Sequence, residues 1–67
     1  MDDNARIYEE AARKNIDTHI GDVAEDGCDL FSEAYVLAFD GAVEAGAPFE
    51  LARVIAAQLA MPYCETE

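Results

Sequence analysis

The chain has 67 residues, which is the size of a single small domain. Its 15 acidic residues outnumber its four basic residues and give a formal net charge of −11, which excludes direct binding to DNA or to an anionic membrane because their phosphates would repel the chain. Apolar residues make up 52% of the chain, too many for a disordered segment, but 13 residues are alanine and none is tryptophan, so we expect a thin core.

The first predicted helix covers residues 3–23. Its apolar positions recur every three or four residues, which is typical of a helix with one buried face. This stripe consists of Tyr8, Ala12, Ile16, His19 and Val23. The opposite face carries acidic and basic side chains four residues apart, such as Glu9 and Arg13, and pairs of this kind stabilise a helix. His19 is the single histidine, and we interpret it as a residue at the boundary of the core.

The second predicted helix covers residues 29–45 and ends at Gly46. It follows an acidic segment that turns at Gly27, and Asp26 with Asp29 three residues later resembles a capping box. The helix is apolar nearly all round, which is typical of a central helix. Several small residues permit a neighbouring helix to approach it closely. These small residues are Ala34, Ala38, Gly41 and Ala45.

Four acidic residues form the one polar strip of this second helix. They follow one another at intervals of four, seven and four residues, and these intervals place all four carboxylates on one face of a helix. We call them the acidic ribbon, which consists of Asp29, Glu33, Asp40 and Glu44.

The third predicted helix covers residues 48–61, with Pro48 at its first position and Pro62 after its last turn. Residues 63–67 form a short acidic tail. The core face expected for this helix consists of Leu51, Val54, Ile55 and Leu59.

Three helices without any strand pattern predict an all-α fold, namely a compact three-helix bundle that forms one domain over residues 1–67. Short connections favour antiparallel packing of adjacent helices. The second and third helices are apolar on more than one face, and a chain this small leaves part of that surface exposed. We therefore expect a homodimer.

The basic residues are unevenly distributed along the chain. Residues 15–52 form a run of 38 residues without lysine or arginine, and this run contains nine acidic residues. Repulsion between neighbouring charges costs on the order of 1 kcal/mol a pair, so the acidity does not serve stability. Three interpretations remain: an acidic face that keeps the protein soluble, a surface that binds a basic partner, or the general acidity of a halophilic proteome.

Our first hypothesis is a small acidic inhibitor or modulator, not an enzyme, that docks on the basic surface of a nucleic-acid-handling protein. A helical row of carboxylates can imitate the regular phosphates of DNA. In size and charge the chain is similar to phage-encoded inhibitors of bacterial defence, such as anti-CRISPR and antirestriction proteins, although it carries no motif of a particular family. Carboxylates would steer the association and aromatic side chains would anchor it. The expected partner-binding residues are Asp22, Glu25, Asp26, Asp29, Glu33, Tyr35, Phe39, Asp40 and Glu44.

The second hypothesis is a helical oligomerisation or adaptor module whose acidity serves only solubility. It predicts that a charge on the apolar face, as in Val36→Glu, abolishes function and that changes on the acidic face do not.

A third alternative is a calcium-binding loop. Residues 22–33 resemble an EF-hand loop, with Asp22, Asp26, Gly27 and Glu33 at the first, fifth, sixth and twelfth positions. The third position is Ala24, which has no ligand oxygen, and the chain has no second loop. We therefore predict no metal site, and we find no pattern that indicates a cofactor or a catalytic residue.

The expected location is the cytoplasm. Asp2, Asp3 and Asn4 stand where a signal peptide carries basic residues, and no apolar run approaches the roughly 20 residues that span a bilayer. The two cysteines, Cys28 and Cys64, lie 36 residues apart, and in a reducing compartment we interpret them as buried or half-buried thiols.

Overall fold

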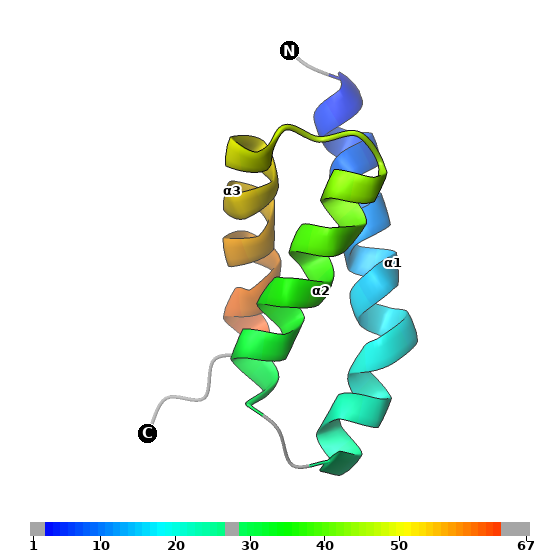
Figure 1. The fold of residues 1–67 in the computed structure, drawn as a ribbon, viewed down its shortest axis with the longest axis vertical. Coiled ribbons are helices and arrows are strands. Elements are labelled where there is room, and N and C mark those ends of the chain that lie inside the picture. Colours follow the sequence, from blue (N-terminus) through cyan, green and yellow to red (C-terminus); the bar gives the residue numbers. More distant parts are fainter. Residues whose placement is uncertain (1–2, 27–28, 64–67) are drawn as a thin grey trace.

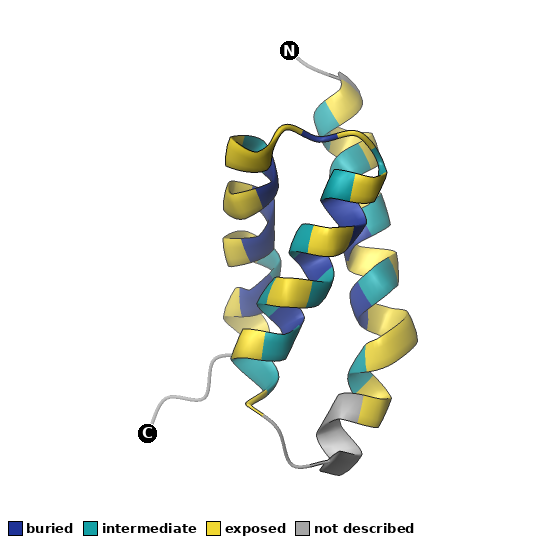
Figure 2. Ribbon diagram, in the orientation of Figure 1, coloured by how far each residue is buried: buried dark blue, intermediate teal, exposed yellow. Residues whose placement is uncertain are grey.

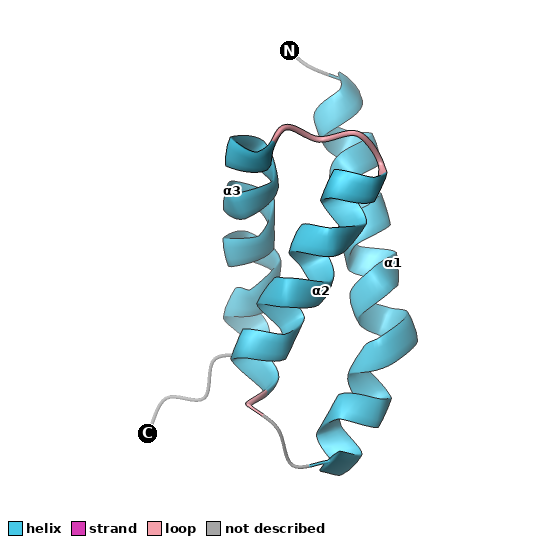
Figure 3. Ribbon diagram, in the orientation of Figure 1, coloured by secondary structure: helices cyan, strands magenta, loops and turns pink. Residues whose placement is uncertain are grey.

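The structure is a computed structural model that describes residues 3–26 and 29–63. Three α-helices follow one another along the chain: α1 (Asp3–Asp26), α2 (Leu30–Glu44) and α3 (Phe49–Ala60). A short 3₁₀ turn, η1 (Met61–Tyr63), follows α3, and the described residues contain no strand (Figure 3). The predicted all-α class is therefore confirmed. The predicted acidic tail lies outside the described residues except for Tyr63.

The first helix begins at Asp3 as predicted, and the other helix ends differ from the predicted ends by one to three residues. Helix α1 continues to Asp26, three residues past its predicted end. Helix α2 is capped by Asp29, whose extended backbone precedes the first helical residue, so Asp26 does not provide the cap. Pro48 likewise precedes α3 as its N-cap residue, with φ −62° and ψ 151°, and is not its first helical residue.

Helix α2 ends in a Schellman motif. Gly46 has a φ of 110°, a conformation that favours glycine because residues with a Cβ atom are strained there. The Gly46 N–H donates to the carbonyl of Val43 at 2.9 Å, and the Ala47 N–H donates to the carbonyl of Ala42 at 3.0 Å. The predicted stop at Gly46 is confirmed, and this turn directs the chain back along α2 into α3.

Helix α2 is the central element of the fold. In Figure 1 the chain descends through α1, ascends through α2 and descends again through α3. Helix α2 packs extensively against both neighbours, whereas α1 and α3 contact each other much less. The molecule is compact, with a radius of gyration of 11.6 Å, but its principal extents of 36 × 23 × 15 Å make it thin in one direction. The predicted central position of the second helix is confirmed.

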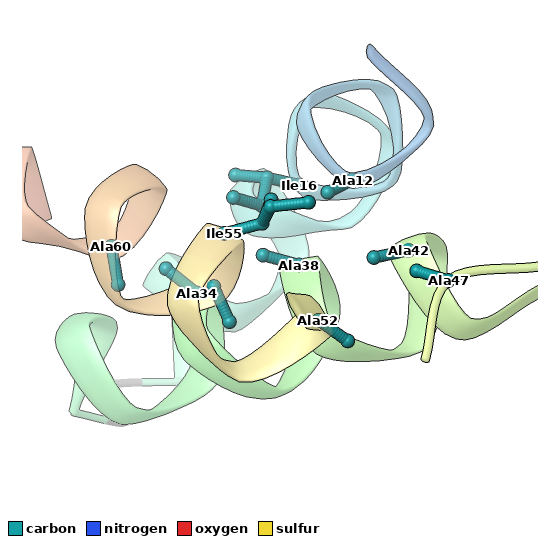
Figure 4. Close-up of a cluster of buried hydrophobic side chains, with 10 residues drawn as sticks. Ala12, Ile16, Ala34, Ala38, Ala42, Ala47, Ala52, Ile55 and Ala60 are labelled. Atoms are coloured by element: carbon teal, nitrogen blue, oxygen red, sulfur yellow. The ribbon is translucent and has the colours of Figure 1, made fainter. Parts of the chain in front are cut away.

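The core of the described residues consists almost entirely of alanine (Figures 2 and 4). Only Ile16 and Ile55 among the buried residues have larger side chains. The predicted core face of α3 is wrong at Val54, which is 53% exposed, whereas Ile55 is buried and Leu51 and Leu59 are partly buried and packed against the core. The helices lie so close together that methyl groups fill the space between them. The buried alanines are Ala12, Ala34, Ala38, Ala42, Ala47, Ala52, Ala56 and Ala60.

Helices α1 and α2 approach each other most tightly at Gly41. A Cβ atom at this position would lie 2.8 Å from the carbonyl oxygen of Ala11 and 2.9 Å from the Cα of Ala12, closer than real Cβ atoms approach backbone. Asn15 lies beside the same point, and its Nδ2 donates to the carbonyl of Leu37 at 2.8 Å. This part-buried hydrogen bond joins the two helices where the missing side chain of Gly41 leaves room for it.

We expect Asn15→Ala to lower the free energy of unfolding by about 1 kcal/mol, because the change removes the bond between helices. Thr18→Ala is the matched control. The Thr18 hydroxyl donates at 2.9 Å to the carbonyl of Lys14 on its own helix and is exposed. Asparagine and threonine have similar helix propensities, so the higher helix propensity of alanine stabilises both variants by about the same amount. Urea denaturation of the two variants tests this, and an equal effect of both substitutions would contradict it.

Candidate functional site

Helix α2 carries the acidic ribbon along its length. Asp40 and Glu44 are exposed, Glu33 is half-buried, and Asp29 is exposed at the N-cap. The intervals of seven and four residues keep the three helical members on one side of α2. At 1.5 Å per residue, the ribbon extends over about 22 Å.

No ion pair joins the ribbon to a basic side chain in the part of the chain that the structure describes, although Lys14 of α1 lines an open hollow together with Glu44. The ion pair found in that part of the chain joins Arg13 to Glu9 on α1, at 3.3 Å between Nη2 and Oε2. Both side chains are largely exposed, so this pair contributes about 0–1 kcal/mol. The predicted pairing within the first helix is thus present at one of its positions, while the exposed carboxylates of Asp40 and Glu44 on α2 form no ion pair within the described residues.

Asp29 differs from the other ribbon residues because its side chain has a local structural role. One carboxylate oxygen accepts a hydrogen bond from the N–H of Phe31, and the other accepts one from the Ser32 hydroxyl, both at 3.1 Å. These bonds satisfy a donor at the start of α2, and the negative charge interacts favourably with the positive end of the helix dipole. Reversing the charge of Asp29 would therefore damage the fold as well as any binding surface.

We expect Asp29→Ala to lower the free energy of unfolding by about 1 kcal/mol through loss of the cap. Asp29→Asn keeps the cap and removes the charge, so its free energy of unfolding should fall much less than that of Asp29→Ala. Asp22→Ala is the control for charge alone, because Asp22 is exposed on α1. Thermal unfolding of the three variants separates cap from charge, and equal losses in Asp29→Ala and Asp29→Asn would show that the cap is not the cause.

Of the remaining predicted binding residues, Asp22 is exposed on α1, and the side chains of Glu25 and Asp26 lie outside what the structure describes. Tyr35 and Phe39 lie on α2 and are half-buried against the core. Their predicted role in binding stays a prediction.

The exposed aromatic side chain is Phe49, which sequence reasoning missed. It is 67% exposed at the first turn of α3, and its ring centroid lies 5.8 Å from that of Phe39 with the planes tilted by 45°. This contact lies within the range of favourable aromatic pairs and holds the ring in place. The available signal was its position directly after Pro48, where a helix begins and its side chains have few neighbours.

The geometry of residues 22–33 does not fit a calcium-binding loop. Asp22 and Asp26, which would provide the first and fifth ligands, belong to α1, and Asp29 already caps α2. Gly27 and Cys28 lie outside the described residues, as does Cys64. Among the described residues, no group of three or more histidine, cysteine, aspartate or glutamate side chains is placed to hold a metal ion.

An open hollow of about 450 Å³ lies between α1 and the end of α3. Its apolar floor includes Ile16 and Leu59, and its rim includes Arg13, which is already paired with Glu9. Its lining also includes Glu9, Asp17 and Tyr63, and among the described residues no histidine, cysteine or serine lines it.

No family model, no curated protein and no solved structure matches this chain. Within the described residues, no helix is both long enough and apolar enough to cross a membrane. The fold and the surface together define a small, acidic, all-helical protein with exposed carboxylates on its central helix.

Proposed function

We propose that the protein binds another protein through the acidic ribbon, as an inhibitor or modulator that docks on the basic surface of a nucleic-acid-handling protein. In this proposal it is an antiparallel three-helix bundle, works as a homodimer and performs no catalysis itself. The observation that supports it best is the set of acidic residues on α2, of which Asp40 and Glu44 are exposed, with no ion pair to a basic residue in the described structure.

The position of Glu44 adds to this support. It lies in the last turn of α2, which contains no basic residue, and the C-terminal end of a helix dipole is negative. A carboxylate there costs stability, whereas lysine or arginine would contribute about 0.3–1 kcal/mol. A surface shaped for stability alone would place a basic residue there, so the acidic side chain is consistent with a requirement of binding.

A basic groove that holds nucleic acid is the surface that a row of carboxylates fits by charge. Complementary charge mainly accelerates association and selects the partner, and it weakens as salt screens it. Phage-encoded inhibitors of bacterial defence are one class of protein to which this description applies. The proposal therefore predicts a partner whose binding site holds either nucleic acid or this protein, but not both at once.

The test is capture on the immobilised protein, followed by elution with increasing salt and, separately, with double-stranded DNA. We expect a basic nucleic-acid-binding protein that leaves between about 0.2 and 0.5 M salt and that DNA displaces at constant salt. A partner that remains bound at high salt and in the presence of DNA would contradict docking through the ribbon.

An adaptor or oligomerisation module is the second candidate, and the exposed apolar residues favour it. Val36 on α2 is 51% exposed, beside the ribbon on the outer side of the helix. Salt-resistant capture of a partner, or recovery of the protein alone, would support this candidate.

A further inference from the structure

Helix α3 is the one helix of this acidic protein whose formal charges balance. Its charged residues are Glu50 and Arg53, whereas both α1 and α2 carry more acidic than basic residues. Two copies of a chain with a net charge of −11 repel each other, and that repulsion is weakest where the contact surface itself is neutral. The outer side of α3 is therefore the surface on which a second copy meets the least opposition.

This outer side is also apolar. Phe49 is 67% exposed and Val54 is 53% exposed. Next to them lies a shallow open hollow of about 470 Å³, which α3 forms together with Tyr35 of α2. The residues that line the hollow are Tyr35, Glu50, Arg53, Val54 and Ala57.

We propose that two copies of the chain associate through the outer sides of their α3 helices, packed antiparallel about a two-fold axis. This inference rests on the homodimer in the proposed function and assigns its surface. In such a pair Glu50 faces Arg53 of the second copy, and the symmetry repeats this ion pair. Phe49 and Val54 then lie on the two edges of the contact and flank these ion pairs.

One register brings both pairs of residues to the same height along the two helices. Glu50 and Arg53 are centred on a point between Leu51 and Ala52, and Phe49 and Val54 are centred on the same point. Glu50 and Arg53 are about 60° apart around the helix, so both lie near the middle of the contact and can reach each other across it. Phe49 and Val54 are about 140° apart, so they lie on the two edges of the contact and flank the ion pairs.

The charges of α3 are available for such a contact. Neither Glu50 nor Arg53 has an ion-pair partner within the described part of the chain. The ring contact with Phe39 already orients Phe49, so little conformational freedom is lost when a second copy covers it. Exposed, orientated aromatic residues of this kind are typical anchors of protein interfaces.

Charge reversal tests the pairing, with self-association measured by sedimentation equilibrium between about 5 μM and 1 mM. We expect Glu50→Arg and Arg53→Glu each to weaken the dimer roughly tenfold or more, because each places like charges together twice. The double variant E50R/R53E restores the pairs in reverse and should return the dissociation constant to within about threefold of wild type. Circular dichroism confirms that each variant retains its helices.

Glu50→Arg distinguishes a specific pair from general repulsion. It makes the chain less negative, so general repulsion alone predicts a stronger dimer, whereas the proposed contact predicts a weaker one. Asp40→Arg is the matched control, because it changes the charge equally on the exposed side of α2 and should not weaken the dimer. A weaker dimer in Asp40→Arg would overturn the assignment to α3.

The remaining outcomes separate this inference from the homodimer itself. A wild-type protein that stays monomeric up to 1 mM would overturn both. A wild-type dimer that Glu50→Arg strengthens, or that the double variant does not restore, would overturn the α3 surface and leave the homodimer standing. Docking of a basic partner on the ribbon is measured separately and does not depend on either result.

Discussion

Gly41→Ala is expected to destabilise the fold, although alanine is the better helix former. The new Cβ atom would meet the backbone of α1 at Ala11 and Ala12, at 2.8 and 2.9 Å, and a backbone cannot rotate away as a side chain can. Overpacking of this kind costs about 1–3 kcal/mol, which exceeds the gain of about 1 kcal/mol in helix propensity. In a domain of this size, we expect the melting temperature to fall by roughly 5–15 °C.

Gly21→Ala is the matched control for Gly41→Ala. Gly21 lies within α1, and a Cβ atom at this position has nothing within 4 Å. The same substitution should therefore raise the free energy of unfolding by about 0.5–1 kcal/mol. Thermal denaturation of both variants should show opposite shifts, and a stabilised Gly41→Ala would mean that α1 and α2 separate easily at this point.

The variant D40K/E44K is expected to lose binding to the basic partner while remaining folded. It removes two exposed carboxylates of the ribbon and spares Asp29, whose side chain caps α2. Lysine in the last turn of α2 interacts favourably with the helix dipole, so the melting temperature should stay constant or rise. We expect at least about a tenfold loss of affinity, because two attractive contacts become repulsive.

The control for this loss is E10K/D17K, which changes the charge equally at two exposed positions of α1. It should reduce affinity by less than about threefold, because it affects only the long-range field, which salt screens. Calorimetry at two salt concentrations measures both variants. Equal losses would show that net charge, and not the ribbon, determines the affinity.

Features that depend on local sequence were predicted well. Gly46 ends α2 because its conformation favours glycine, and the small residues of the second helix do permit the close approach of α1. Helix ends were less accurate. Asp26 and Asp29 are both good capping residues, and the choice between them depends on how far α1 continues.

Features that depend on how closely the helices pack were not predicted. Val54 was assigned to the core by its spacing, but it lies on the outer side of α3, and alanines occupy most of the fully buried positions. The contact of Asn15 with Leu37 gives no signal in the sequence, because it joins positions 22 residues apart. Phe49 was missed because exposure at a helix start depends on what the neighbouring helix covers.

The alanine core also affects the entropy of folding. A buried leucine or methionine loses rotamer freedom, which costs about 0.5–2 kcal/mol, whereas a buried alanine loses none. The fully buried positions of this chain are mostly alanine, and these positions immobilise few rotatable bonds. Its stability therefore depends both on the fit between helix backbones and on the larger side chains packed against the alanines, such as Leu37 and Leu59, and an alanine scan would leave the eight buried alanines untested.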